Sequence, residues 1–170
     1  ACDYYGTGQV LPVAGSQMAI QLLPRLRRAG KVGVLSPCYA EHAHAWRSNG
    51  YIVREVLEQE VDFYIDSLDV LVVVNPNNPT GLSLSTSRLL DWHARLASRG
   101  GWLVVDEAFM ENTPALSLAP FAHQVGRIVL RSFGKFCGRA GVRLGVVLAE
   151  RRLLKLLGEQ GGPWAVSGPT

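Results

Sequence analysis

The chain has 170 residues, of which 48% are hydrophobic and 18% charged, and its formal net charge is +3. This balance predicts one folded domain and excludes a disordered segment, and so small a charge gives no sign of a nucleic-acid partner. No apolar run reaches the ~18 residues that span a bilayer. The cysteines, Cys2, Cys38 and Cys137, are too widely spaced for a disulfide framework or a zinc site. We therefore expect a cytoplasmic protein with neither a membrane nor a nucleic-acid partner.

Short apolar segments alternate along the chain with helical patterns. We expect helices at 16–28, 40–49, 85–99 and 150–158, and we place His42 and His44 on the surface of the second. Strands are expected at 10–13, 31–35, 52–56, 70–74, 102–105, 127–130 and 144–148. The alternation predicts an α/β fold with a mostly parallel sheet, in which ligands bind at the carboxyl ends of the strands.

A lysine, Lys135, lies among glycines and small residues directly before the last expected strand. Ser132 lies three residues before it and Arg143 eight residues after it. Glycines let backbone and cofactor approach closely, and an amine in a half-buried site can attack a carbonyl carbon. Arg143 offers a planar fork for phosphate oxygens. The alternative interpretation is a solvated basic loop.

Two further motifs follow expected strands. Residues 75–81, with the sequence N-P-N-N-P-T-G, form a constrained loop in which Asn78 precedes a proline and offers a rigid side-chain donor. Asp106 follows a buried strand, where a carboxylate needs a cationic partner such as a protonated ring nitrogen, an arginine or a lysine. The alternatives are a plain connecting turn and a structural salt bridge.

A glycine turn, formed by Gly15, Ser16 and Gln17, opens the first expected helix. Backbone N–H groups at a helix start suit a phosphate, although Ser16 is equally consistent with an ordinary N-cap. Together the motifs describe a ligand with an aldehyde, a basic ring nitrogen, a ring hydroxyl and a phosphate, which is pyridoxal 5′-phosphate (PLP). Its contacts would be Lys135 for the aldehyde, Asp106 for the nitrogen, Asn78 for the hydroxyl, and Gly15, Ser16, Gln17, Ser132 and Arg143 for the phosphate.

The chain closely resembles the fold-type I, class I/II aminotransferase family, in which N-P-x-N-P-T-G, D-E-A-[YF] and S-x-x-K followed by an arginine recur in this order. The resemblance implies a three-layer sandwich with a mostly parallel mixed sheet, the large domain of a PLP-dependent transferase. It implies catalytic roles for Lys135, which bonds covalently to the cofactor, and Asp106, which keeps the ring nitrogen protonated. It further implies that Tyr39 stacks on the cofactor ring. A core tyrosine is the alternative for Tyr39.

Within the family, three segments resemble the threonine-phosphate decarboxylase branch of cobalamin biosynthesis: D-E-A-F at 106–109, L-R-S-x-x-K-F at 130–136 and P-W-x-V at 163–166. Phe109 stands where the family usually has tyrosine. The implied reaction is a PLP-dependent decarboxylation of L-threonine O-3-phosphate to (R)-1-amino-2-propanol O-2-phosphate. The rival is a histidinol-phosphate or other class I/II aminotransferase. A ligand-sensing domain of a regulator, or an α/β domain without cofactor, is the non-catalytic alternative.

Family members are longer than this chain. We therefore expect residues 1–170 to be an incomplete PLP-binding large domain that lacks an N-terminal arm and a C-terminal small domain. The resemblance implies a homodimer at full length, and we expect this fragment alone to be inactive.

Overall fold

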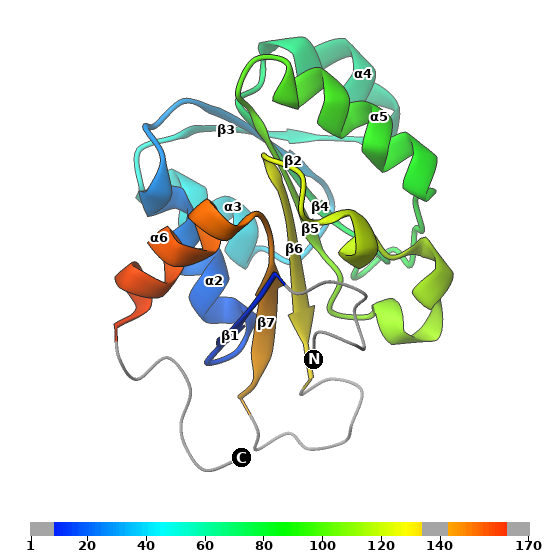
Figure 1. Cartoon of the computed structure of the whole chain (residues 1–170). Helices are drawn as coiled ribbons and strands as arrows, with labels where there is room; N and C mark the ends of the chain where they lie inside the picture. Colours follow the sequence, from blue (N-terminus) through cyan, green and yellow to red (C-terminus); the bar gives the residue numbers. More distant parts are fainter. Residues whose placement is uncertain (1–8, 134–142, 163–170) are drawn as a thin grey trace.

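The computed structural model describes residues 9–133 and 143–162, and in these residues seven strands form one sheet in the order β1-β7-β6-β5-β4-β2-β3 (Figure 1). The strands are β1 (Val10–Val13), β2 (Lys31–Leu35), β3 (Ile52–Val56), β4 (Val70–Val74), β5 (Trp102–Asp106), β6 (Arg127–Ser132) and β7 (Gly145–Leu148). The helices are α2 (Ser16–Leu22), α3 (Glu41–Ser48), α4 (Val61–Tyr64), α5 (Thr86–Ala97) and α6 (Arg151–Gly161). Short 3-10 turns, η1 (Leu23–Leu26), η2 (Glu58–Glu60), η3 (Ile65–Ser67), η4 (Met110–Asn112), η5 (Pro114–Leu116) and η6 (Ala119–Phe121), complete the connections.

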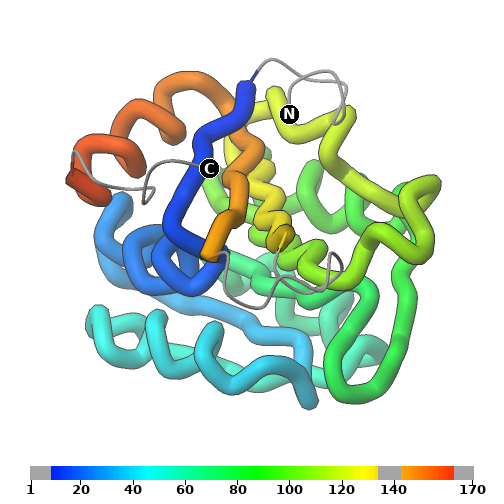
Figure 2. The backbone as a smooth tube through the Cα atoms, turned by 90° about the horizontal axis from the view of Figure 1, so that it is seen from below, coloured from blue at the N-terminus to red at the C-terminus, as the bar shows by residue number. Residues whose placement is uncertain are grey.

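The sheet is mixed but mostly parallel, as predicted. Strands β3, β2, β4, β5 and β6 pair in parallel, whereas β7 is antiparallel to both of its neighbours, β6 and β1. Every strand except β7 therefore ends at the same edge of the sheet, the one toward which the arrow of β6 points in Figure 1, and β7 begins there. Figure 2 is seen from this edge and shows β1 and β7 side by side.

Helices cover both faces of the sheet and make a three-layer sandwich (Figure 1). Helices α2, α3 and α6 pack on one face, and α4 and α5 pack on the other. Alternate residues of the central strand β4 serve the two cores, because successive side chains in a strand point to opposite faces. Val70 and Val72 belong to the first core, and Leu71 and Val73 to the second.

The boundaries differ from the sequence expectation where a local feature intervenes. The helix expected at 16–28 ends at Leu22 and continues as the 3-10 turn η1, because Pro24 has no backbone N–H to donate to the preceding turn. Strands β5 and β6 run on to Asp106 and Ser132, polar residues that a search for apolar runs leaves out. Helix α4 is a single turn and was not predicted. Across residues 9–133 and 143–162, no helix has the length and apolarity needed to cross a membrane.

Candidate cofactor site

The predicted site residues that the structure describes lie at or just beyond the strand ends. Gly15 follows β1, Tyr39 follows β2, and Asn78 follows β4, while Asp106 and Ser132 end β5 and β6. Because these strands run in one direction, their ends share one edge of the sheet. The topology therefore brings together residues that are far apart in the chain.

Asp106 is buried, with 3% of its surface exposed, and its carboxylate is held by two donors. Its Oδ2 lies 2.8 Å from His42 Nε2, and its Oδ1 accepts a hydrogen bond of 3.0 Å from the backbone N–H of Ala108. An ionised carboxylate only accepts hydrogen bonds, so His42 donates through Nε2. About two of the four lone-pair positions of the carboxylate remain for a further donor.

The surface position predicted for His42 is wrong. His42 is 1% exposed, because it lies on the inner face of α3 one turn before the buried Trp46, whereas His44 is exposed as predicted. Two features of the sequence pointed to this contact. The i, i+4 spacing puts His42 and Trp46 on one helix face, and Asp106 needed a cationic or donating partner. The structure supplies that partner from the protein itself.

Residues from three segments meet at the start of β7. Ser132 pairs with Gly145 in the β6–β7 ladder, and the next residue, Phe133, donates its N–H to Leu144 O at 3.0 Å. A Cβ on Gly145 would lie only 2.8 Å from Ser16 N, and a Cβ on Gly15 would lie 4.0 Å from Arg143 Cβ. The turn that opens α2, Ser132 and Arg143 are therefore neighbours, as the phosphate interpretation requires.

Gly15 rather than Ser16 is the N-cap of α2, and no side chain caps the helix. Gly15 has a φ of +83°, a backbone conformation that residues other than glycine rarely adopt. The interpretation of Ser16 as an ordinary N-cap is therefore wrong, and Ser16 is the first residue of the helix.

A chain of hydrogen bonds crosses from α2 to α3. The Tyr39 hydroxyl donates to Gln17 Oε1 at 3.3 Å, and Gln17 Nε2 donates to Glu41 Oε2 at 3.0 Å. The ring of Tyr39 stands edge-on to that of His42, with 6.3 Å between the ring centroids. Tyr39 is 40% exposed, so it is not a core tyrosine. Glu41, which the sequence interpretation missed, orients the amide of Gln17.

The loop that carries Asn78 is fixed by its other two asparagines. Asn75 exchanges hydrogen bonds with the backbone of Leu84 at 2.8 and 3.2 Å, and its own N–H donates to Asp106 O at 2.9 Å. Asn77 donates to Pro37 O at 2.7 Å and so ties the loop to the segment that precedes Tyr39. Asn78 itself is exposed at the tip of this braced loop.

The thiol of Cys38 directly precedes Tyr39 in the chain. Burial raises the pKa of Cys38 to about 11, and the charges of Asp106 and Glu55 add to the effect. A thiol with this pKa is protonated at neutral pH, so Cys38 is a poor nucleophile there.

Several predicted features lie outside the described residues. These are Lys135, the glycines around it, the end of the L-R-S-x-x-K-F segment, the P-W-x-V segment at 163–166, and the cysteines Cys2 and Cys137. Of the D-E-A-F segment, Phe109 is 37% exposed and occupies the turn after β5.

Comparison with known proteins identifies relatives along the whole chain. The family model for aminotransferase class I and II matches residues 1–170. Threonine-phosphate decarboxylase from Pseudomonas aeruginosa is 67% identical over 169 residues, which are 99% of this chain and 51% of the relative. The enzyme of the same name from a Sinorhizobium species is 47% identical, again over 99% of this chain and 51% of the relative.

Histidinol-phosphate aminotransferases match at lower identity. The one from Shigella sonnei is 31% identical over 95% of this chain and 48% of the relative. The crystal structure of the enzyme from Clostridium acetobutylicum superposes with a TM-score of 0.86 over 97% of this chain and 53% of that chain, at 20% identity. The chain spans about half the length of the curated relatives that it matches. Since the family model matches the chain from end to end, the chain belongs to the aminotransferase class I and II family.

Proposed function

We propose that this chain is the cofactor-binding part of a PLP-dependent lyase, a threonine-phosphate decarboxylase. The reaction removes the carboxylate of L-threonine O-3-phosphate and yields (R)-1-amino-2-propanol O-2-phosphate for cobalamin biosynthesis. The observation that carries the proposal is the identity of 67% to the Pseudomonas aeruginosa decarboxylase across 99% of the chain. The family itself depends on PLP, which is the cofactor of this chain.

The residues at the carboxyl edge fit PLP. The absence of a side chain at Gly145 lets the start of β7 pack against the start of α2, because a Cβ there would lie 2.8 Å from Ser16 N. Ser132 and Arg143 add a hydroxyl and a guanidinium for a phosphate. Asp106 retains acceptor capacity for a protonated ring nitrogen after its bonds to His42 and Ala108. We propose that Asn78 bonds the ring hydroxyl and Tyr39 stacks on the ring.

When it is bound, PLP draws electrons from the Cα of an attached amino acid, so that a bond at that carbon can break. Asp106 would hold a proton at the ring nitrogen, and His42 Nε2, at 2.8 Å, keeps the carboxylate oriented for this role. We propose that Lys135 would hold the cofactor aldehyde through Nζ until the substrate amine displaces it, and that the freed amine would then donate the proton that replaces the carboxylate on Cα. Residues that orient the substrate would select the carboxylate bond rather than the Cα–H bond.

The second candidate is a histidinol-phosphate aminotransferase, which the relatives at 31% identity favour less strongly. Incubating the full-length protein with L-threonine O-3-phosphate separates the two. Release of CO₂ without a keto-acid acceptor is the expected result. Formation of pyridoxamine phosphate and a keto acid without CO₂, with continued turnover only when a keto-acid acceptor is added, would contradict the decarboxylase and favour the aminotransferase.

Residues 1–170 are, in this proposal, the large domain of a longer cytoplasmic enzyme that acts as a homodimer on a small phosphorylated amino acid. Polypeptide 1–170 should then turn over threonine phosphate far more slowly than the full-length protein. Equal turnover by the two would refute the domain assignment. Sedimentation of the full-length protein tests the dimer, and a monomeric active enzyme would refute it.

A further inference from the structure

Buried charged residues also lie at the carboxyl ends of β5 and β6, on the face of the sheet opposite the candidate site. Glu107 directly follows Asp106, and Arg131 directly precedes Ser132. Successive side chains along a strand alternate between faces. Val105 and Val129 belong to the core beneath α5. Residues 107 and 131 come two positions later and so point to the same face of the sheet. Glu107 and Arg131 therefore lie behind the site.

Arg131 joins two carboxylates of the segment that follows β5. Its Nη1 lies 3.0 Å from Glu107 Oε2, and its Nη2 lies 3.1 Å from Glu111 Oε1. Glu107 also accepts hydrogen bonds from Ser117 Oγ at 2.6 Å and from Leu118 N at 2.7 Å. Arg131 is 3% exposed and Glu107 is not exposed at all. One guanidinium thus bridges β6 to the connection that begins at Asp106.

The backbone next to this bridge is tightly packed at the site. The N–H of Glu107 donates to Leu130 O at 2.8 Å, and that of Phe133 donates to Leu144 O at 3.0 Å. A Cβ on Gly145 would come within 3.0 Å of Arg131 O. A shift of Arg131 would therefore reach Gly145 and, through it, the start of α2.

Burial of an ion pair is weak evidence that it stabilises a fold, since desolvation of the charges offsets their attraction. Position is more informative here. The same face of β6 carries a second buried arginine, Arg127, at the other end of the strand, where it contacts Phe121 O at 2.6 Å and His93 Nδ1 at 2.9 Å. Of these two arginines, Arg131 is the one that precedes Ser132 and binds Glu107, the neighbour of Asp106.

We propose that Arg131 is a positioning residue for the cofactor site. By holding Glu107 and Glu111 it fixes the carboxyl ends of β5 and β6, and with them the placement of Asp106 and Ser132. The inference rests on the proposed function, because these two residues matter here as groups that hold PLP.

The test compares Arg131→Met with Arg127→Met in the full-length protein. Each variant replaces a buried guanidinium on one face of one strand with an unbranched apolar chain, so both lower stability. Only Arg131→Met should weaken PLP binding, by about tenfold or more, by analogy with the loss of metal affinity when a group that orients a metal ligand is removed. It should also shift the absorbance maximum of the bound cofactor, whereas Arg127→Met leaves both at the unmodified values.

Amide hydrogen exchange on the cofactor-free protein gives a second readout. Arg131→Met should speed exchange at the amides of Glu107 and Phe133, and Arg127→Met at the amide of Leu103, which donates to Gly126 O at 2.8 Å. If Arg131→Met fails to fold, Glu111→Gln removes one of the two carboxylate charges and keeps the side-chain size. It should speed exchange at the amides of Glu107 and Phe133 to a lesser degree.

The outcomes separate the inference from the function. Equal PLP affinity in the two arginine variants, with the same amides affected, would overturn the positioning role of Arg131. Failure of the unmodified full-length protein to bind PLP would instead overturn the proposed function.

Discussion

At the scale of single residues, the contact between His42 and Asp106 joins the helix layer to the sheet edge. His42→Phe keeps a ring on the inner face of α3 but leaves Asp106 Oδ2 without this donor in a buried position. A buried acceptor that loses its partner costs about 1–3 kcal/mol. We expect the free energy of unfolding, measured with urea, to fall by that amount.

His44 supplies the control, because it lies exposed in the same helix. His44→Phe should change the free energy of unfolding by less than about 0.5 kcal/mol. Equal losses of unfolding free energy in the two variants would mean that the hydrogen bond between His42 and Asp106 does not stabilise the protein, and that the loss comes from placing phenylalanine in α3.

His93 makes stability depend on pH. Its Nε2 donates to Val125 O at 2.9 Å, so its Nδ1 is the acceptor for Arg127 Nη2. Burial lowers the pKa of His93 below its ordinary value of 6.5; the bond to Val125 opposes this shift and the charge of Arg127 adds to it. As the pH falls through 6.5 the unfolded chain takes up this proton first, so stability is complete above that pH and is lost below it.

His93→Gln tests this behaviour, because an amide both donates and accepts but does not titrate. Between about pH 8 and about pH 5.5, the loss of unfolding free energy should be smaller in the variant than in the unmodified protein. The exposed His123 is the matched control, and His123→Gln should leave the loss unchanged. Identical pH profiles of unfolding free energy for all three proteins would contradict a contribution of His93 to the pH dependence.

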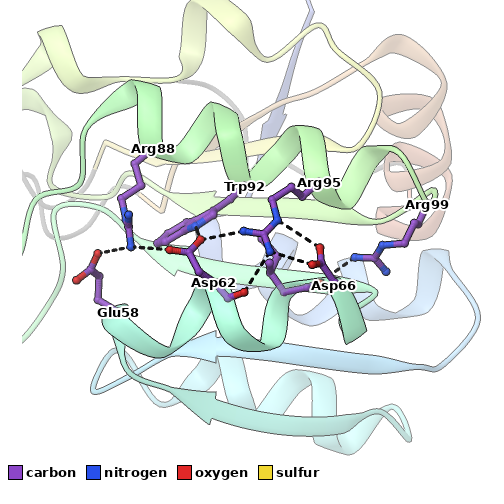
Figure 3. A network of polar contacts seen from close by, with 8 residues as sticks. Glu58, Asp62, Asp66, Arg88, Trp92, Arg95 and Arg99 are labelled. Atoms are coloured by element: carbon purple, nitrogen blue, oxygen red, sulfur yellow. Dashed lines mark hydrogen bonds and ion pairs between the residues drawn. The ribbon is translucent and has the colours of Figure 1, made fainter.

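At the scale of elements, an ionic network joins α5 to the segment formed by η2, α4 and η3 (Figure 3). Asp62 lies at its centre. Its Oδ1 lies 3.0 Å from Arg95 Nη1, and its Oδ2 lies 3.4 Å from Arg88 Nη2. Its Oδ1 also accepts a hydrogen bond of 3.0 Å from the indole N–H of Trp92. The Asp62 side chain is half-exposed, so its ion pairs contribute at most about 1 kcal/mol. Trp92 is fully buried, so its N–H depends on Asp62.

Asp62→Ala should therefore lower the free energy of unfolding by about 1–3 kcal/mol, most of it from the unpaired indole. Urea unfolding at low salt and at about 1 M salt separates the contribution of the ion pairs from that of the indole hydrogen bond, since salt screens the ion pairs and leaves the hydrogen bond. Asp91, exposed on α5, the helix that carries Trp92, is the control. A loss that vanishes at high salt would contradict a contribution from Trp92.

The sequence predicts some elements better than others for physical reasons. Strands β1 to β4 have the predicted bounds because they are short and rich in β-branched residues, and no site residue interrupts them. The ends of β5 and β6 were missed because a site residue, Asp106 or Ser132, replaces the apolar pattern there. Where function occupies the end of a strand, hydrophobicity no longer marks it.

The site shows the same division. The turn at Gly15, the aspartate at the end of β5 and the asparagine loop could be placed from the sequence because parallel strands share a carboxyl edge. The roles of His42 and Glu41 were missed, because they depend on how α3 packs against the sheet and against Gln17. Local patterns predict which residues reach the edge, and tertiary packing decides which residues support them.

At the scale of the whole molecule, the central claim is that one cofactor joins a lysine, a carboxylate, an amide and a guanidinium from separate segments. The chain contains three lysines, Lys31, Lys135 and Lys155. Lys31 begins β2 at the opposite edge of the sheet, and Lys155 lies on α6, so both serve as internal controls.

The decisive measurement is borohydride reduction of the full-length protein in the presence of PLP, followed by peptide mapping of the modified lysine. The account predicts a stable phosphopyridoxyl group on Lys135 and none on Lys31 or Lys155. Modification of either of those two lysines in place of Lys135, or no modification at all, would contradict it.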